Sequence, residues 1–405
     1  MSLGVYIQVP FCQTKCTYCN FHTGVVSTAV YEPYVAAVCR EIRAHAALLR
    51  AAGIAEAAAV NSRRASGLTV ADGDLQGVAR EADTLYVGGG TPSLLDPRAL
   101  AQLHDAVRGA FDCALVEITL EADPETITSE KAAAWLAAGF NRVSLGAQSF
   151  NDAELKAAGR MHRRDDIYAA NHTLREAGFA NLSFDLICGL PHQTSQSWAN
   201  SLGELLALRP EHISIYLLEV DEGSRLGREV ISLGTRYSAP AIPSDDEMAA
   251  FYEQACERLA AAGYDHYEIS NWALPGRRSR HNLKYWQREP YFGFGAGAHS
   301  FNGAERWANA HDPAAYVASI EQGRLPIEQH ERLTPQQALD EELFLGLRLL
   351  EGIDAARIER EYDVSLLPRL AALRDAGLLE MEGHTARLAR SRLAVSNEVF
   401  VELMS

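Results

Sequence analysis

Strand-like and helix-like segments alternate along the first half of the chain, and this alternation restricts the possible fold more than any other feature. Between the strand-like runs lie amphipathic segments such as 31–49 and 165–179, in which apolar residues recur at the helical steps of three and four. Six such β–α units predict a parallel sheet with helices outside it, curled into a barrel or an open partial barrel. We therefore expect an α/β fold, a partial (β/α)6 barrel. The six strand-like runs are 4–10, 83–90, 116–122, 142–149, 182–191 and 212–220.

The pattern changes outside these units. Residues 55–83 lack periodicity and predict a long loop before the second strand, and residues 221–243 contain several Gly and Pro residues and predict irregular structure. A helix is expected from about Ser244 to Ala262, since its first turn is acidic. From Thr334 the chain is mostly helical with a hairpin-like turn, which predicts a small winged-helix-like domain. The expected parts are a core over 1–235, a barrel extension over 236–330 and a helical domain over 331–405.

Composition and charge argue against several classes of protein. The formal net charge of −16 argues against nucleic-acid binding, which needs a basic face. The sequence contains no run of about 18 apolar residues, so no transmembrane helix is expected. Strand-like sequence begins at the first residues, so no signal peptide is expected either. Four scattered cysteines do not form a secreted disulfide framework, and we expect buried thiols in a cytoplasmic protein. These four are Cys39, Cys113, Cys188 and Cys256.

Three further cysteines, Cys12, Cys16 and Cys19, follow the first strand-like run with the spacing C-x3-C-x2-C. Three thiolates on one tight loop can hold three corners of a cubane iron–sulfur cluster and leave its fourth iron open to a second ligand. His22 lies three residues after Cys19, so a closed Cys3His zinc site is the alternative that the spacing leaves open.

Polar residues recur where the strand-like runs end, which is the edge at which parallel α/β barrels carry their active sites. Gly88 to Gly90 and Thr91 end the second run, and these glycines let the backbone approach a ligand closely. An ordinary strand-exit turn and solvated strand ends are the alternatives for each residue taken alone. The other polar residues at the ends of the strand-like runs are Glu121, Gln148, Asp185 and Glu219 on the third to sixth runs, with Arg160 after the fourth.

The segments YIQVPFCQTKCTYC, GGGTP, LEADP, SLGAQSF and FDLICGLPHQT together resemble the radical S-adenosylmethionine (SAM) proteins of the oxygen-independent coproporphyrinogen III oxidase group. The resemblance covers nearly the whole chain, including the C-terminal helical part. It implies a [4Fe–4S] cluster on Cys12, Cys16 and Cys19, with SAM on the fourth iron. Tyr18 matches the aromatic residue that the family usually has beside the last cysteine, and Glu219 is a further candidate. The implied SAM contacts are Tyr6, Gly89, Gly90, Thr91, Glu121, Gln148, Arg160 and Asp185.

Two branches of this group have to be distinguished. The oxidase branch decarboxylates two propionates of coproporphyrinogen III, carries an extended segment before the cluster loop and has a further cysteine two positions after the third. Here eleven residues precede Cys12, and Phe21 occupies the position of the further cysteine. Both departures count against oxidase activity.

The haem-chaperone branch, of the HemW type, is marked by an H-N-x-x-Y-W motif, which this chain contains as HNLKYW over 281–286. A neutral His281 imidazole could ligate haem iron, and Tyr285 and Trp286 offer flat apolar faces to a porphyrin. Arg277, Arg278 and Arg280 could pair with haem propionates. A helix end with a surface histidine is the plain alternative, and His299 is a weaker second candidate for the ligand.

The sequence thus predicts a cytoplasmic haem chaperone of the radical SAM family that binds a [4Fe–4S] cluster, SAM and haem. Its predicted partners are haem and respiratory apo-haem proteins, and a homodimer is compatible with the sequence. The first alternative is an oxygen-independent coproporphyrinogen III dehydrogenase of porphyrin biosynthesis, and the second is a zinc-binding protein. The sequence does not say whether SAM is cleaved.

Overall fold

Six parallel strands form the centre of the computed structural model, which describes residues 2–55, 81–231 and 242–404. Each strand pairs with the next in chain order, and the strands belong to a twelve-stranded sheet with the order β12-β11-β10-β9-β1-β2-β3-β4-β5-β6-β8-β7 within the described part. The predicted partial barrel is therefore confirmed. The six strands are β1 (Leu3–Val9), β2 (Glu81–Gly89), β3 (Asp112–Ala122), β4 (Arg142–Gln148), β5 (Leu182–Cys188) and β6 (His212–Leu217).

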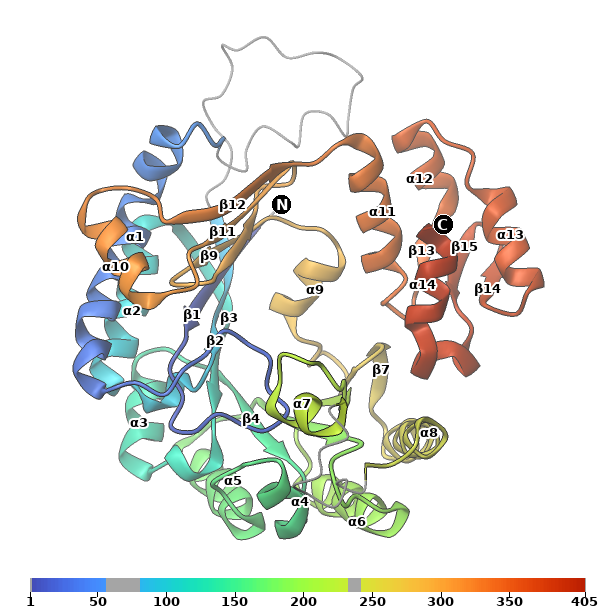
Figure 1. Cartoon of the computed structure of the whole chain (residues 1–405), viewed down its shortest axis with the longest axis horizontal. Helices are drawn as coiled ribbons and strands as arrows, with labels where there is room; N and C mark the ends of the chain where they lie inside the picture. Colours follow the sequence, from blue (N-terminus) through green and yellow to red (C-terminus); the bar gives the residue numbers. More distant parts are fainter. Residues whose placement is uncertain (1, 56–80, 232–241, 405) are drawn as a thin grey trace.

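Helices cover the outer side of this curved sheet (Figure 1). Successive side chains of a strand point to opposite faces, so each strand contributes to two environments. In β1, Val5 and Ile7 are fully buried in the hydrophobic core, whereas Tyr6 and Gln8 line a cavity. The outer helices are α1 (Tyr31–Ala51), α2 (Pro97–Ala110), α3 (Ser129–Ala137), α4 (Asp152–Ala157), α5 (Arg164–Ala177) and α6 (Ser195–Leu208).

Short strands extend the sheet at both edges. On one edge β9 pairs with β1 in parallel and β10, β11 and β12 continue antiparallel, and on the other edge β8 and β7 follow β6. The segments of this region are β7 (Asp265–Glu268), β8 (Asn271–Ala273), β9 (Tyr291–Phe294), β10 (His299–Phe301), β11 (Glu305–Asn309), β12 (Ile327–Arg332), α7 (Arg225–Ile231), α8 (Asp245–Ala261), α9 (Arg280–Trp286) and α10 (Pro313–Glu321).

Two loop predictions and one helix prediction fall in or near this region. The helix predicted from Ser244 is confirmed as α8, and the Glu247 carboxylate accepts a hydrogen bond of 2.8 Å from the Ser244 amide in a capping box. Of the irregular structure predicted over 221–243, residues 232–241 lie outside the described part, and the prediction is wrong at 225–231, which form α7. Of the loop predicted over 55–83, residues 56–80 lie outside the described part, and β2 already begins at Glu81.

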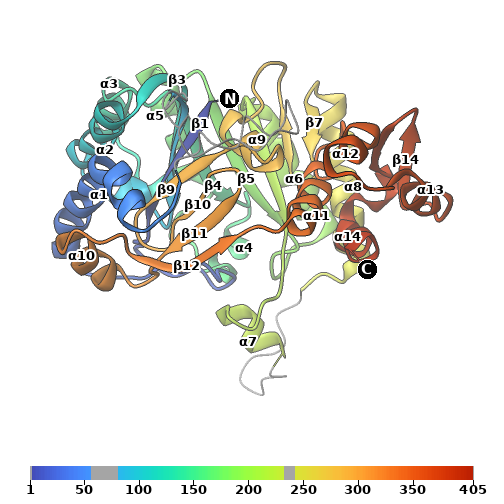
Figure 2. The same ribbon diagram turned by 90° about the horizontal axis from the view of Figure 1, so that it is seen from above.

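The C-terminal part lies beside α8 and β7, away from α1 and α2 (Figures 1 and 2). It is mostly helical and contains a β14–β15 hairpin, as predicted. No helix in the described ranges combines the length and the apolar character needed to cross a bilayer. The C-terminal segments are α11 (Pro335–Gly346), β13 (Ile353–Asp354), α12 (Ala355–Tyr362), α13 (Leu367–Asp375), β14 (Leu379–Glu382), β15 (Thr385–Leu388) and α14 (Ser396–Met404).

The four scattered cysteines differ in exposure. Cys39 and Cys188 are buried and Cys256 is partly buried, as expected of thiols that pack as small hydrophobic groups. Cys113 is exposed near the start of β3, so the prediction of a buried thiol is wrong there.

A buried carboxylate fastens the edge strands to α1. Glu41 is 1% exposed, and its carboxylate accepts hydrogen bonds from the Gly295 amide (3.0 Å), the Asn309 side-chain amide (2.8 Å) and the Tyr316 hydroxyl. Burial raises the pKa of Glu41 to about 7, although the three donors act in the opposite direction. This side chain therefore joins α1 to the segments around β9, β11 and α10.

Replacing Glu41 by Ala should lower the free energy of unfolding by about 2–3 kcal/mol, because buried donors lose their acceptor. The loss of stability should be larger near pH 5 than near pH 8. A carboxyl whose pKa is raised by folding stabilises the protein at low pH, and this stabilisation is lost as the pH rises through about 7. Urea denaturation at both pH values measures this. Glu32→Ala, at an exposed position of the same helix, is the control and should change stability by less than about 1 kcal/mol. Equal losses in the two variants would contradict the assignment.

Candidate functional site

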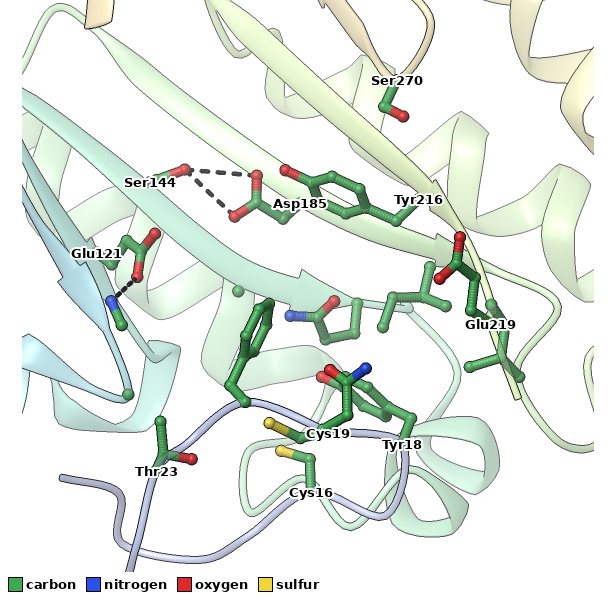
Figure 3. A pocket seen from close by; sticks show the side chains of 18 of the residues that line it. Cys16, Tyr18, Cys19, Thr23, Glu121, Ser144, Asp185, Tyr216, Glu219 and Ser270 are labelled. Carbon is green, nitrogen blue, oxygen red and sulfur yellow. Dashed lines mark hydrogen bonds between the residues drawn. The ribbon is translucent and has the colours of Figure 1, made fainter. Parts of the chain in front are cut away.

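A cavity of ≈ 990 Å³ opens at the C-terminal ends of the parallel strands. This volume is near the upper end for small-molecule sites in proteins, so the cavity has room for more than one ligand group. All of the residues predicted to bind the cluster or SAM line it (Figure 3 shows part of the set). They are Tyr6, Cys12, Cys16, Tyr18, Cys19, Gly89, Gly90, Thr91, Glu121, Gln148, Arg160, Asp185 and Glu219.

The loop that carries the three cysteines is fixed by backbone hydrogen bonds on two sides. On one side the Thr91 amide donates to the Phe11 carbonyl (2.7 Å), next to Cys12. On the other side the Thr17 amide donates to the Ala158 carbonyl at the end of α4 (3.0 Å). The loop thus has a defined path across the cavity, and Figure 3 shows Cys16 and Cys19 on it, facing the strand ends.

The three thiols are suited to a cluster rather than to a single ion. Burial is the main cause that raises the pKa of Cys12 and Cys19, so these thiols release their protons when iron binds. In the described part of the chain, no three His, Cys, Asp or Glu side chains are arranged to hold one metal ion. A tetrahedral zinc site needs such convergence, whereas in a cubane cluster each thiolate binds a different iron. The arrangement disfavours the Cys3His zinc alternative with His22.

An ion pair lies beside the cysteine loop. The Arg160 guanidinium contacts the Asp123 carboxylate, donates to the Gly146 carbonyl (2.9 Å) and lies 3.6 Å from the Cys16 sulfur. The Thr91 hydroxyl donates to the other oxygen of Asp123 (3.0 Å). Neighbouring negative groups, above all Asp123, raise the pKa of Arg160 well above its usual value, so the site holds a permanent cation next to one cysteine. Sequence reasoning missed Asp123, although its spacing of two from Glu121 was a usable signal for one strand face.

The glycine turn after β2 meets a carboxylate from β3. Glu121 accepts hydrogen bonds from the Gly89 amide (2.9 Å) and the Tyr86 hydroxyl (2.8 Å), and burial raises its pKa to about 7. Gly89 has φ +113°, and a Cβ atom there would lie 2.5 Å from the Gln8 side chain. Only glycine fits this turn without moving its neighbours.

The remaining strand ends add polar groups to the same wall. The Asp185 carboxylate accepts from the Ser144 hydroxyl (3.2 Å and 3.4 Å to its two oxygens), and burial raises the pKa of Asp185 (Figure 3). Gln148 ends β4 with φ +64°, a left-handed conformation that is uncommon for a residue other than glycine. Glu219 lies exposed beyond the end of β6 and faces the cavity. Acceptors and donors therefore surround the cavity, with the Arg160 cation beside the cysteine loop.

His281 lies apart from this set. Its side chain is 1% exposed, Nδ1 is 2.9 Å from the Thr84 hydroxyl and Nε2 is 2.9 Å from the Tyr285 hydroxyl. Burial lowers the pKa of His281 to about 3, so the ring is neutral, but both of its nitrogens are engaged. The next residues of the motif, including Tyr285 and Trp286, do line the cavity. The predicted arginine cluster at 277–280 is not part of the cavity lining in the described chain, and Arg278 instead pairs with Asp265 (2.6 Å) and Glu351 (2.6 Å).

A parallel α/β sheet with three cysteines on the loop after its first strand, and with the glycine turn and carboxylates at the following strand ends, defines a radical SAM protein. Comparison with known proteins agrees. Residues 73–205 match the family model of the radical SAM superfamily, and residues 333–391 match the HemN C-terminal domain. The crystal structure described as coproporphyrinogen III oxidase (HemN) from Escherichia coli superposes with a TM-score of 0.80 at 22% identity, and covers 100% of this chain and 90% of that one. At that identity the likeness establishes the fold alone.

Similar sequences carry the name "Heme chaperone HemW". The protein from Bacillus subtilis is 32% identical over 98% of both chains. The protein from Mycobacterium tuberculosis is 36% identical over 94% of this chain and 89% of its own length. The chain therefore belongs to the HemW family of radical SAM proteins.

Gly90 allows the closest approach between the turn after β2 and the cysteine loop. A Cβ atom at Gly90 would lie 2.5 Å from the Phe11 carbonyl and 2.9 Å from the Cys12 sulfur. Gly90→Ala should therefore lower the free energy of unfolding by about 1–3 kcal/mol, because the backbone must shift. Gly109→Ala, in α2 with open space around the position, is the control and should raise stability by about 0.5–1 kcal/mol. Urea denaturation of both variants measures these changes in the free energy of unfolding. An unchanged stability of Gly90→Ala would refute the tight packing at this turn.

Proposed function

We propose that this protein is a haem chaperone that carries a [4Fe–4S] cluster and SAM, binds haem in the cavity and delivers it to respiratory apo-haem proteins in the cytoplasm. The observation that supports this most directly is that a chain of this family has its expected cluster and SAM residues around one cavity. Relatives named as haem chaperones align over nearly the whole chain, and the residues expected to hold the cluster and SAM line one cavity.

Cys12, Cys16 and Cys19 are the proposed cluster ligands. They share one loop with fixed ends, and the position two after Cys19 is Phe21, which lies in the cavity lining and is 67% exposed. A fourth thiolate is thus missing from the loop, and one iron is left for SAM. Together the cluster and SAM supply one-electron chemistry when bound.

The proposed SAM site uses the strand ends. The backbone at Gly89 and Gly90 approaches a ligand closely because no side chain is in the way. Glu121 and Asp185 offer acceptors to hydroxyl or ammonium donors, and Arg160 offers a cation near a carboxylate. The pairing of Arg160 with Asp123 fixes the guanidinium in place before a ligand arrives.

Haem is proposed to occupy the remaining part of the cavity, against the rings of Tyr285 and Trp286. Flat aromatic faces suit a porphyrin, and the half-buried Trp286 ring contacts Arg348, a further residue of the cavity lining, whose guanidinium carbon lies 4.5 Å from the ring centroid. The exposed Phe21 is a further aromatic ring of the lining.

Each of the variants Cys12→Ala, Cys16→Ala and Cys19→Ala should lose most of the about four irons per chain expected after anaerobic reconstitution, together with the brown colour. Cys113→Ala is the matched control, since this thiol is exposed and lies outside the cavity lining. Iron and sulfide analysis measures the outcome. Full iron content in the three variants, or zinc bound in place of iron in the wild type, would rule out the proposed cluster.

The cluster-loaded wild type should bind haem stoichiometrically and transfer it to a haem-free cytochrome subunit, but should not decarboxylate coproporphyrinogen III. Trp286→Ala should weaken haem binding by roughly tenfold, because the porphyrin loses a flat partner. Trp198→Phe, deep in the core, is the control for loss of a tryptophan. The appearance of decarboxylated porphyrinogen, detected by mass spectrometry, would favour the oxidase alternative. Size-exclusion chromatography of the same samples tests the predicted homodimer.

A further inference from the structure

Three histidines from separate segments line one wall of the cavity. They are His22, after the cysteine loop, His299, at the start of β10, and His311, between β11 and α10. The ring centroids of His22 and His311 lie 3.8 Å apart, with the ring planes tilted by 33°. His299 pairs with Ala308 in the β10–β11 ladder, three residues before His311, which places these two histidines on neighbouring segments.

These rings differ from His281 in what their nitrogens do. Within the described ranges the exposed ring of His299 makes no hydrogen bond, and Nδ1 of His311 is buried without a partner. His281, by contrast, has both nitrogens in hydrogen bonds, one with Thr84 of β2 and one with Tyr285 of its own helix α9. An iron ligand needs a nitrogen lone pair that faces the ligand space, and His299 has that arrangement without any rearrangement of its neighbours.

The surroundings also keep His299 in the form that binds iron. Burial at the cavity wall is the largest cause that lowers the pKa of His299, and the nearby His311, Arg306 and His22 lower it further. A neutral imidazole is therefore present at neutral pH, and only the neutral ring is an iron ligand.

The wall fits haem better than a free metal ion. No three His, Cys, Asp or Glu side chains of the described residues are arranged around one point, so a simple ion would lack ligands. Haem iron already has four porphyrin nitrogens and needs only an axial ligand from the protein. Phe21 and Trp286 line the same cavity as apolar rings, and Lys15 lines it as an exposed cation for a propionate.

We propose that His299 is the axial ligand of the haem iron, with the neighbouring rings of His22 and His311 on the same wall, and that His281 positions the aromatic residues of its motif instead. This inference rests on the proposed haem binding and names the ligand within that site. The decisive observations are the free, cavity-facing ring of His299 and the full engagement of His281.

The test is an anaerobic titration of cluster-loaded, SAM-saturated full-length protein with ferric haem. Difference absorption in the Soret region and electron paramagnetic resonance of the iron are the readouts. His299→Gly should weaken haem binding by roughly tenfold or more and remove the signature of imidazole ligation. Added imidazole should restore that signature, because it fills the space left by the side chain. Metal-free protoporphyrin IX should bind wild type and His299→Gly equally well.

His172→Ala is the matched control, because this histidine is exposed on the outer helix α5, and its spectra should equal those of the wild type. An unchanged iron signature in His299→Gly would overturn the inference, and so would equal losses of haem and metal-free porphyrin without rescue by imidazole. The behaviour of the wild type distinguishes a failure of the proposed function from a failure of the ligand assignment. If it binds no haem at all, the proposed function fails together with the inference, whereas a haem-binding wild type with an unaffected His299→Gly variant refutes only the ligand.

Discussion

The parallel pairing of β1 with β2 is the constraint on which the site depends. Its register sets Gln8 opposite Gly88 and Val9 opposite Gly89, so the loop after β1 and the turn after β2 leave the sheet at the same height. Hydrogen bonds from the backbone of the turn then reach the beginning of the cysteine loop. The three thiols stand beside the glycines because two strands end together, and the other strand ends add their polar groups around this pair.

Buried polar residues hold the same frame from outside the cavity. Glu41 connects α1 to the edge segments, and Glu117 of β3 accepts hydrogen bonds from the amides of Arg280 (3.0 Å) and His281 (3.0 Å) at the start of α9. A carboxylate at a helix N-terminus compensates unpaired amides and the positive end of the helix dipole. Each of these carboxylates joins segments far apart in the sequence, so the edge of the sheet and α9 keep fixed positions relative to the strand ends.

Most of the central fold, and the polar residues at its strand ends, could be predicted from the sequence, for a physical reason. Parallel strands that are buried against helices are apolar, and function is confined to their carboxyl ends, so Glu121, Gln148 and Asp185 stand out as polar residues after apolar runs. The short edge strands were not recognisable, because β8 and β10 have three residues each and no visible period. The meeting of His22 with His311 was also not predictable, because it depends on how β11 and the cysteine loop pack.

The placement of His281 illustrates a second limit. A seven-residue helix such as α9 is too short for its sequence to tell which side faces a cavity, and the motif gives residue types without directions. In the structure His281 sits between Thr84 of β2 and the Tyr285 hydroxyl, with its ring centroid 5.3 Å from that of Tyr86. The hydrogen bond with Thr84 joins α9 to the sheet, and the hydrogen bond with Tyr285 fixes that side chain within α9. A residue can thus define a ligand site by orienting the side chains that line it, and this accounts for a motif whose histidine is buried while its aromatic residues face the ligand space.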